Sequence, residues 1–335
     1  PSMTLGGRWV RRRSGGLSVR FHDTEGEVVP VKAKRWLALG LAAALAFALV
    51  GCGGGATTEK PAGEEPAGEE LTGSINIEGS DTMVNLALVW AERYQQDHPD
   101  VRVSVTGGGS GTGISALING TVDIANASRA IKAEETQLAK SHGFAPIEHI
   151  VARDAIAVIV HPSNPVQRLT LRQISDIYRG RISNWKELGG EDRPIVRLSR
   201  ETNSGTHVYF LESVIRLGEK ENKTLFSTDT LLLPSSEGII HEIRHNPNAI
   251  GYDGLGYVPK DLKVLAVAKE PGGKYILPMI STANDKSYPI ARDLYMYTAG
   301  EANGALKDYL DWILSDEAQE IVSELGFVPI VKYNP

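Results

Sequence analysis

Hydrophobic and polar positions along residues 74–325 follow two alternating periods, which predict strands followed by helices. Short apolar runs or alternating apolar positions predict strands over 74–77, 101–105, 122–125, 156–160 and 195–198. Apolar residues three or four apart predict helices over 83–95, 114–119, 171–178, 206–217 and 305–325. Because strands and helices alternate, we expect an α/β fold with a mostly parallel sheet.

Three of the predicted strand-to-helix junctions have the same chemistry. They are rich in Gly, Ser and Thr, and we expect the glycine-dense segment 107–113 to be a loop. In an open α/β sheet such junctions lie outside the carboxyl ends of the strands, where ligands bind. The residues concerned are Gly79, Ser80, Asp81 and Thr82, then Ser110, Gly111, Thr112 and Gly113, and finally Ser204, Gly205 and Thr206.

Such junctions suit an anion. Glycine lets the backbone approach a ligand, hydroxyls donate hydrogen bonds, and the first turn of a helix presents unpaired N–H groups at its positive end. Taken singly, each segment also fits an ordinary helix cap, since Ser, Thr and Asp are the usual capping residues. The three segments together predict a site that encloses a dehydrated tetrahedral anion.

Arg200 is the candidate charged anchor of this site. It follows the strand predicted over 195–198, and its planar fork matches two oxygens of one phosphate. The alternative is a surface ion pair, for which Glu201 is the neighbouring acid.

The first 73 residues predict export and lipid anchoring. A basic cluster at Lys32, Lys34 and Arg35 precedes an uncharged run over 36–50, which is typical of a signal peptide and shorter than a membrane-spanning helix. The only cysteine, Cys52, follows directly and resembles the lipidated residue of a bacterial lipoprotein. We therefore expect a leader and signal peptide over 1–51, with residues 1–30 preceding the natural start, and a lipidated flexible linker over 52–73.

Charge narrows the range of partners. The formal net charge is −6, and it becomes −11 once residues 1–51 are removed. No nucleic-acid partner is therefore indicated. An acidic protein can still bind an anion where local hydrogen bonds and helix ends supply the attraction. Residues 74–335 suffice for two domains and contain no further apolar stretch of spanning length.

One set of residues is specific when taken together: the segments 79–82, 109–113, 121–129, 249–252 and 254–257, with Arg200 and 204–206. This set resembles a known family, the phosphate-binding receptors (PstS) of bacterial phosphate ABC transporters, and the resemblance covers 74–335. It implies a type II, two-lobed periplasmic-binding-protein fold with lobe 1 over 74–152 and 288–335, and lobe 2 over 153–287. It implies a monomeric receptor that passes inorganic phosphate to an ABC permease, without catalysis, cofactor or metal. The implied ligands are Thr82, Met83 (through its backbone), Ser110, Arg200, Ser204, Gly205 and Thr206.

One position departs from the family pattern. Some relatives have an acidic residue after the Ala-Ser pair, where it accepts the proton of bound phosphate and excludes sulfate, but here that residue is Arg129. Arg129 can bind the anion itself, Ser128 can donate to it, or Asp81 can accept its proton; we favour Ser128 as a ligand. A receptor for sulfate or arsenate, or a phosphate-binding surface or sensing protein, remains the alternative function.

One motif points to a different chemistry. The sequence His241-Glu242-Ile243-Arg244-His245 matches a zinc-protease helix. Pro247 ends the helix soon afterwards, and no Glu about twenty residues further on supplies a third ligand. We therefore expect no zinc site.

Overall fold

The computed structural model describes residues 71–330. The predicted signal peptide, Cys52 and nearly all of the predicted linker lie outside these residues. Within the described range, no helix is both long and apolar enough to cross a membrane.

Strands and helices alternate along the first part of the described chain, as predicted. They are β1 (Gly73–Gly79), α1 (Asp81–Asp97), β2 (Val101–Thr106), α2 (Ser110–Ile118), β3 (Ile124–Ala127) and α3 (Ala133–Ser141). The middle part comprises β4 (Ile147–Val160), β5 (Arg168–Thr170), α4 (Leu171–Tyr178), β6 (Val196–Arg200), α5 (Gly205–Phe210), β7 (Leu231–Leu233), α6 (Ser236–His245) and β8 (Ala249–Gly254). The last part comprises β9 (Lys263–Val264), β10 (Ala266–Ala268), α7 (Ile280–Asn284), β11 (Ala291–Thr298), α8 (Gly304–Ile313) and α9 (Asp316–Glu324).

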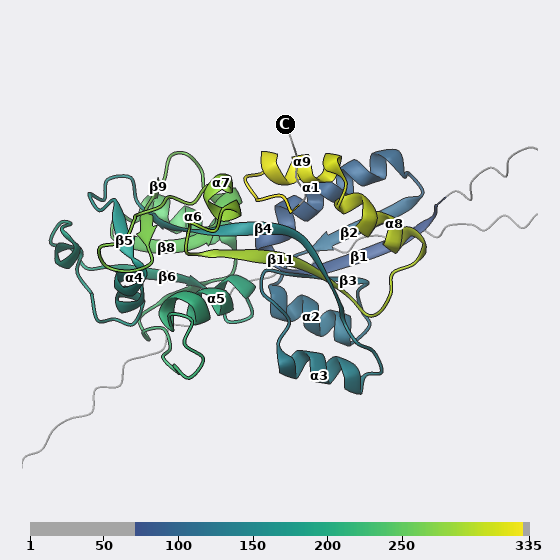
Figure 1. The fold of residues 1–335 in the computed structure, drawn as a ribbon, viewed down its shortest axis with the longest axis horizontal. Coiled ribbons are helices and arrows are strands. Elements are labelled where there is room, and N and C mark those ends of the chain that lie inside the picture. Colours follow the sequence, from purple (N-terminus) through teal and green to yellow (C-terminus); the bar gives the residue numbers. More distant parts are fainter. Residues whose placement is uncertain (1–70, 331–335) are drawn as a thin grey trace, which may run out of the picture. The chain divides into compact units, whose positions relative to one another are not determined.

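The main sheet is mixed rather than mostly parallel. Its strand order is β2-β1-β3-β11-β4-β8-β6-β7, with β9 paired to β4 (Figure 1). The pairs β1–β2, β1–β3, β6–β7 and β6–β8 are parallel. The long strands β4 and β11 lie between these two parallel groups and pair antiparallel with each other and with their other neighbours. They therefore connect the two groups.

Helices cover both faces of the sheet in the first group. The apolar residues of α1, α8 and α9 pack on one face, with Trp90 and Tyr309 fully buried, while α2 and α3 lie on the other (Figure 1). A second large cluster forms around Ile156, Tyr178 and Phe210, with α4 and α5 packed on β4 and β8. Each of the two groups of strands thus has its own main hydrophobic core.

Several predicted boundaries differ from the structure. The predicted loop over 107–113 is partly wrong, because α2 begins at Ser110 and its first turn contains the Ser-Gly-Thr-Gly segment. The single helix predicted over 305–325 is two helices, since Ser315 starts α9 by accepting a hydrogen bond from the Ala318 N–H. The strand predicted over 156–160 begins earlier, at Ile147, where cross-strand pairing with β11 extends it.

Candidate functional site

The three Gly/Ser/Thr segments meet in space, as the junction argument predicts. They follow β1, β2 and β6, and they form the starts of α1, α2 and α5. The Thr82 and Thr206 hydroxyl oxygens lie 2.8 Å apart and share a hydrogen bond. The Gly111 N–H donates to the carbonyl of Asn203, 3.0 Å away, so the second segment contacts the third directly.

Ser128 joins this cluster from the end of β3. Its backbone N–H donates to Ser110 Oγ over 3.0 Å, and the two hydroxyls lie 3.3 Å apart. Gly205 packs directly against both: a Cβ placed there would overlap Ser110 Oγ and lie 2.6 Å from Ser128 Oγ. A side chain at this position would therefore require both hydroxyls to move, whereas glycine allows the close approach.

Hydrogen-bond donors remain available at the start of α1. Ser80 is 2% exposed, and within the described residues its hydroxyl has no hydrogen-bond partner. A buried hydroxyl without a partner costs free energy, so the arrangement favours an acceptor there. The Met83 N–H, which the sequence predicts as a ligand, instead already donates to the carbonyl of Ser80, 3.0 Å away.

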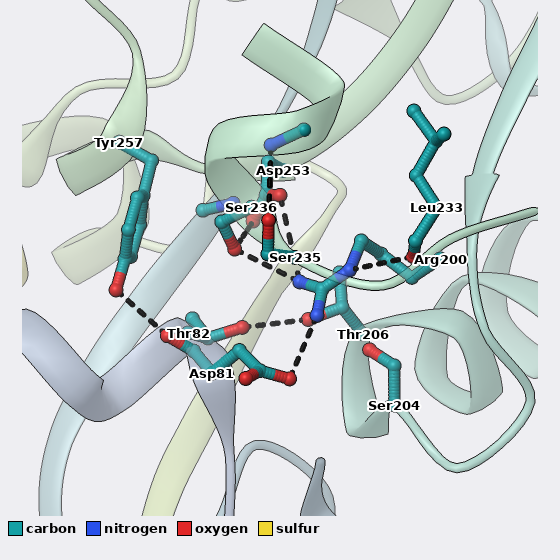
Figure 2. A network of polar contacts seen from close by, with 12 residues as sticks. Asp81, Thr82, Arg200, Ser204, Thr206, Leu233, Ser235, Ser236, Asp253 and Tyr257 are labelled. Atoms are coloured by element: carbon teal, nitrogen blue, oxygen red, sulfur yellow. Dashed lines mark hydrogen bonds and ion pairs between the residues drawn. The ribbon is translucent and has the colours of Figure 1, made fainter. Parts of the chain in front are cut away.

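Arg200 is fully buried, and its partner is Asp81 rather than Glu201 (Figure 2). One guanidinium nitrogen donates to Asp81 Oδ2 over 2.8 Å, and the other donates to Ser236 Oγ over 2.9 Å. Asp253 lies 3.8 Å from the second nitrogen. Asp81 is also not the N-cap of α1, because Ser80 holds that position and the Asp81 carboxylate instead accepts from the Gly108 N–H.

Asp253 is buried beneath Arg200 at the end of β8. Burial raises the pKa of its carboxyl group to about 6, although Arg200, the Gly254 N–H and Ser236 all favour the ionised form. The sequence argument missed both Ser236 and Asp253, which lie 36 and 53 positions after Arg200. Only the packing of α6 and β8 on β6 brings them to its guanidinium.

Three of the predicted ligand residues, Arg129, Thr112 and Ser204, form hydrogen bonds with other groups of the protein. The Arg129 guanidinium donates to both carboxylate oxygens of Glu135, at 2.8 and 2.6 Å. It also lines a cavity of about 380 Å³ together with Lys132 and Tyr209. The Thr112 hydroxyl donates to the carbonyl of Gly108 within its own segment. Ser204 is buried, and its hydroxyl accepts from the His207 N–H at the start of α5.

The structure also brings in Arg292, which sequence reasoning missed. Arg292 lies on β11 with its side chain 2% exposed, and it donates to Thr206 Oγ1 and to the carbonyl of Ser128. The sequence did contain a signal for it, since Arg292 is the one basic residue within the largely apolar stretch 288–297. Asn203 was also missed; its amide donates to the carbonyl of Gly108 over 2.8 Å.

The zinc-protease motif lies apart from these loops on α6. The rings of His241 and His245 have centroids 4.4 Å apart. Among residues 71–330, no group of three or more His, Cys, Asp or Glu side chains is arranged to hold a metal ion.

Comparison with known proteins places the chain in a family. Residues 61–317 match the model of the PBP superfamily domain. The chain is 30% identical to the phosphate-binding protein PstS of Pseudomonas aeruginosa over 87% of its own length and 94% of that protein, and 32% identical to PstS of Bacillus subtilis over 87% and 92%.

A solved structure is also similar to this chain. It is that of a putative phosphate ABC transporter substrate-binding protein with bound phosphate from Clostridium perfringens, matched with a TM-score of 0.69 and 33% identity over 77% of this chain and all of that one. The α/β, two-lobed periplasmic-binding-protein fold predicted from the sequence is therefore confirmed. The chain belongs to the PBP superfamily and, within it, to the family of PstS phosphate-binding proteins.

Proposed function

We propose that this chain captures inorganic phosphate and delivers it to an ABC permease. The observation that carries the proposal is the meeting of the starts of α1, α2 and α5 around Thr82 and Thr206, beside a buried arginine. The relatives named PstS and the phosphate-bound neighbour support phosphate as the ligand. The family consists of substrate-binding receptors, so the protein is not an enzyme.

We propose that the ligand is held by hydrogen bonds and by the charge of Arg200. Hydroxyl and backbone N–H groups supply donors to the anion oxygens, and Arg200 supplies charge. Asp81, already held by Arg200, is our candidate acceptor for the proton of bound phosphate. The full proposed set is Ser80, Asp81, Thr82, Met83, Ser110, Gly111, Thr112, Ser128, Arg129, Arg200, Ser204, Gly205 and Thr206.

We propose lobe boundaries at 74–152 with 288–335, and at 153–287. The distribution of buried residues supports the first boundary, since within β4 the core membership changes between Ala152 and Ala155. Near β11 the change comes between Ile290 and Leu294, a few residues after 288, because Tyr288 and Ile290 still pack in the second cluster. The bonds Thr82–Thr206, Gly111–Asn203 and Arg200–Asp81 would then all join the two lobes. A ligand that contacts both lobes favours the closed state by those contacts.

We propose that the receptor is a monomer held outside the membrane by a lipid on Cys52. The signal-peptide pattern before Cys52 supports this, as does a family of extracytoplasmic binding proteins. A Cys52→Ala variant expressed in a bacterium is expected to move from the membrane fraction to the soluble exported fraction. Unchanged membrane association of that variant would contradict lipid anchoring at Cys52.

Calorimetric titration tests the function. The full chain is dialysed free of anion and titrated with phosphate and then with sulfate at neutral pH. We expect tight phosphate binding that is lost in Arg200→Ala but retained in Arg197→Ala, because Arg197 is a buried arginine of the same strand that pairs with Asp229 instead. Equal binding of both anions would favour the broader oxyanion receptor, and binding of neither would refute the proposal.

A titration of Asp81→Asn tests the proton-accepting role. If Asp81 accepts the phosphate proton, this variant loses its preference for phosphate over sulfate. A retained preference would remove Asp81 from that role and leave Ser128 and Arg129 as the groups to test.

A further inference from the structure

Arg292 occupies the centre of the proposed phosphate site without belonging to any of its loops. It lies on β11, and its guanidinium donates to the carbonyl of Ser128 over 2.8 Å and to Thr206 Oγ1 over 2.9 Å. A longer contact of 3.4 Å reaches Thr82 Oγ1. Within the described residues, Arg292 Nε is buried and has no hydrogen-bond partner.

The donor and acceptor roles at the two threonines follow from this placement. A hydroxyl carries one O–H donor and two acceptor lone pairs, whereas a guanidinium can only donate. Arg292 therefore occupies acceptor positions on both Thr82 Oγ1 and Thr206 Oγ1. One threonine proton lies in the bond between the two hydroxyls, which leaves the other free to point away from Arg292.

Asp154 fixes the guanidinium in this position. It lies directly opposite Arg292 in the β4–β11 ladder. Its Oδ2 accepts over 2.9 Å from the guanidinium nitrogen that also donates to Thr206 Oγ1. Asp154 is fully buried. A buried ion pair is often no more stabilising than an apolar pair of similar volume, so stability alone is a weak reason for these two charges.

The neighbouring ladder position provides a comparison. Arg153 and Asp293 form a second ion pair, 2.8 Å long, with the charges reversed between the strands. Because side chains alternate across a strand, this pair lies on the opposite face, and about a third of each side chain is exposed. The same two strands thus carry one pair that contacts the loops and one that does not.

We propose that Arg292 is a positioning residue of the anion site. Because one proton of the Thr82–Thr206 pair lies between the two hydroxyls, Arg292 directs the remaining hydroxyl proton of the pair to the ligand. The inference rests on the proposed phosphate function and deepens it. Arg292 keeps its charge throughout the physiological pH range, so neither hydroxyl can turn its proton toward it. The pair of hydroxyls therefore favours an anion that presents unprotonated oxygens.

The test compares phosphate binding by two double variants. In Arg292→Gln/Asp154→Asn both buried charges are removed together, so that neither remains unpaired. We expect phosphate affinity to fall roughly 10- to 100-fold. The control Arg153→Gln/Asp293→Asn removes the neighbouring ion pair and is expected to change affinity by less than about threefold.

A purely structural role of Arg292 would give a different result. If Arg292 acts through the hydroxyls, its effect on affinity shrinks in a Thr206→Val background, which a double-mutant cycle measures. A purely structural pair gives additive losses instead. Should the double variant fail to fold, Arg292→Lys keeps the charge beside Asp154 but lacks the fork, and we expect roughly a tenfold loss.

The outcomes separate the two proposals. Absence of phosphate binding by the wild-type chain overturns both. Binding by the wild type, with a folded Arg292 variant that binds within about threefold of it or with additive losses in the cycle, overturns only the role of Arg292.

Discussion

At the scale of single residues, the candidate site is defined by close contacts that leave little room. Gly205 lies against two hydroxyls, and Arg200 is enclosed by Asp81, Ser236 and Asp253. We therefore expect the addition of one methyl group or the removal of one charge here to change the geometry of the site.

Gly205→Ala is expected to weaken phosphate binding by about tenfold or more and to destabilise the chain by about 1–3 kcal/mol. Its methyl group would overlap Ser110 Oγ and press on Ser128 Oγ. Calorimetry and thermal unfolding measure the two effects. Gly238→Ala is the matched control: its nearest neighbour would be 3.4 Å away, and affinity should not change. Normal binding by Gly205→Ala would show that the loops separate more readily than this packing implies.

Asp253 makes the stability of the chain depend on pH. Its pKa rises from 3.8 to about 6 in the folded chain because of burial, which Asp154 reinforces and Arg200, the Gly254 N–H and Ser236 oppose. The folded chain therefore binds the proton more tightly than the unfolded chain. The associated stability is fully present below pH 3.8 and is lost as pH rises through about 6.

The expected loss is on the order of 3 kcal/mol between about pH 4 and pH 6.5, relative to Asp253→Asn. Urea unfolding of both proteins in the absence of phosphate measures it. The free energy of unfolding of the wild type, minus that of the variant, should fall across this range. A flat difference would mean that Asp253 keeps its ordinary pKa.

At the scale of elements, the starts of helices form the site, and they also explain two boundaries that were predicted wrongly from the sequence. Glycine within 107–113 indicates a loop, yet Ser110–Gly113 forms the first turn of α2, where the carbonyls of Gly109 and Asn203 accept from its N–H groups. Ser315 divides the predicted terminal helix because its hydroxyl caps α9.

Ser315→Ala is expected to destabilise the chain by about 1 kcal/mol through loss of this cap. Phosphate affinity should stay unchanged, since Ser315 lies outside the loops of the site. The control Ser323→Ala lies within the same helix and should be neutral or slightly stabilising. Denaturant unfolding compares the two; an equal effect of both would argue against the capping role.

At the scale of the whole molecule, the proposed function depends on contacts between segments far apart in sequence. Asn203 contributes such a contact without lying among the proposed ligands: its amide donates to the carbonyl of Gly108 and lies 3.4 Å from Thr112 Oγ1. If these bonds join the two proposed lobes, they favour the closed form.

Asn203→Ala is therefore expected to weaken phosphate binding by roughly 3- to 10-fold, because fewer molecules occupy the closed form. Calorimetry gives the affinity, and small-angle scattering gives the radius of gyration without anion, which should increase. Asn222→Ala serves as control, since its side chain bonds to Arg216, Glu219 and the Thr224 N–H and to none of the loops of the site. An unchanged affinity would limit the role of Asn203 to local loop structure.

The sequence by itself determined the local elements and most of the candidate ligands. Period and glycine placement located β1, α1, β2 and α4, and the three Ser/Gly/Thr segments lie at strand-to-helix junctions as predicted. These features are local: helix and strand periods, and the residue types that suit a helix start, can be read within a few positions.

Only the tertiary structure decided which charged groups join the site. Asp81 and Arg200 are 119 positions apart, and Thr82 and Arg292 are 210 apart. No local pattern distinguishes Asp253 or Asp154 from a surface acid, and Arg129 was placed against Glu135 by the turn before α3. The antiparallel pairing of β11 with β4 and the parallel pairing of β6 with β8 bring these side chains together. Which strands become neighbours in a mixed sheet depends on the packing of the whole core.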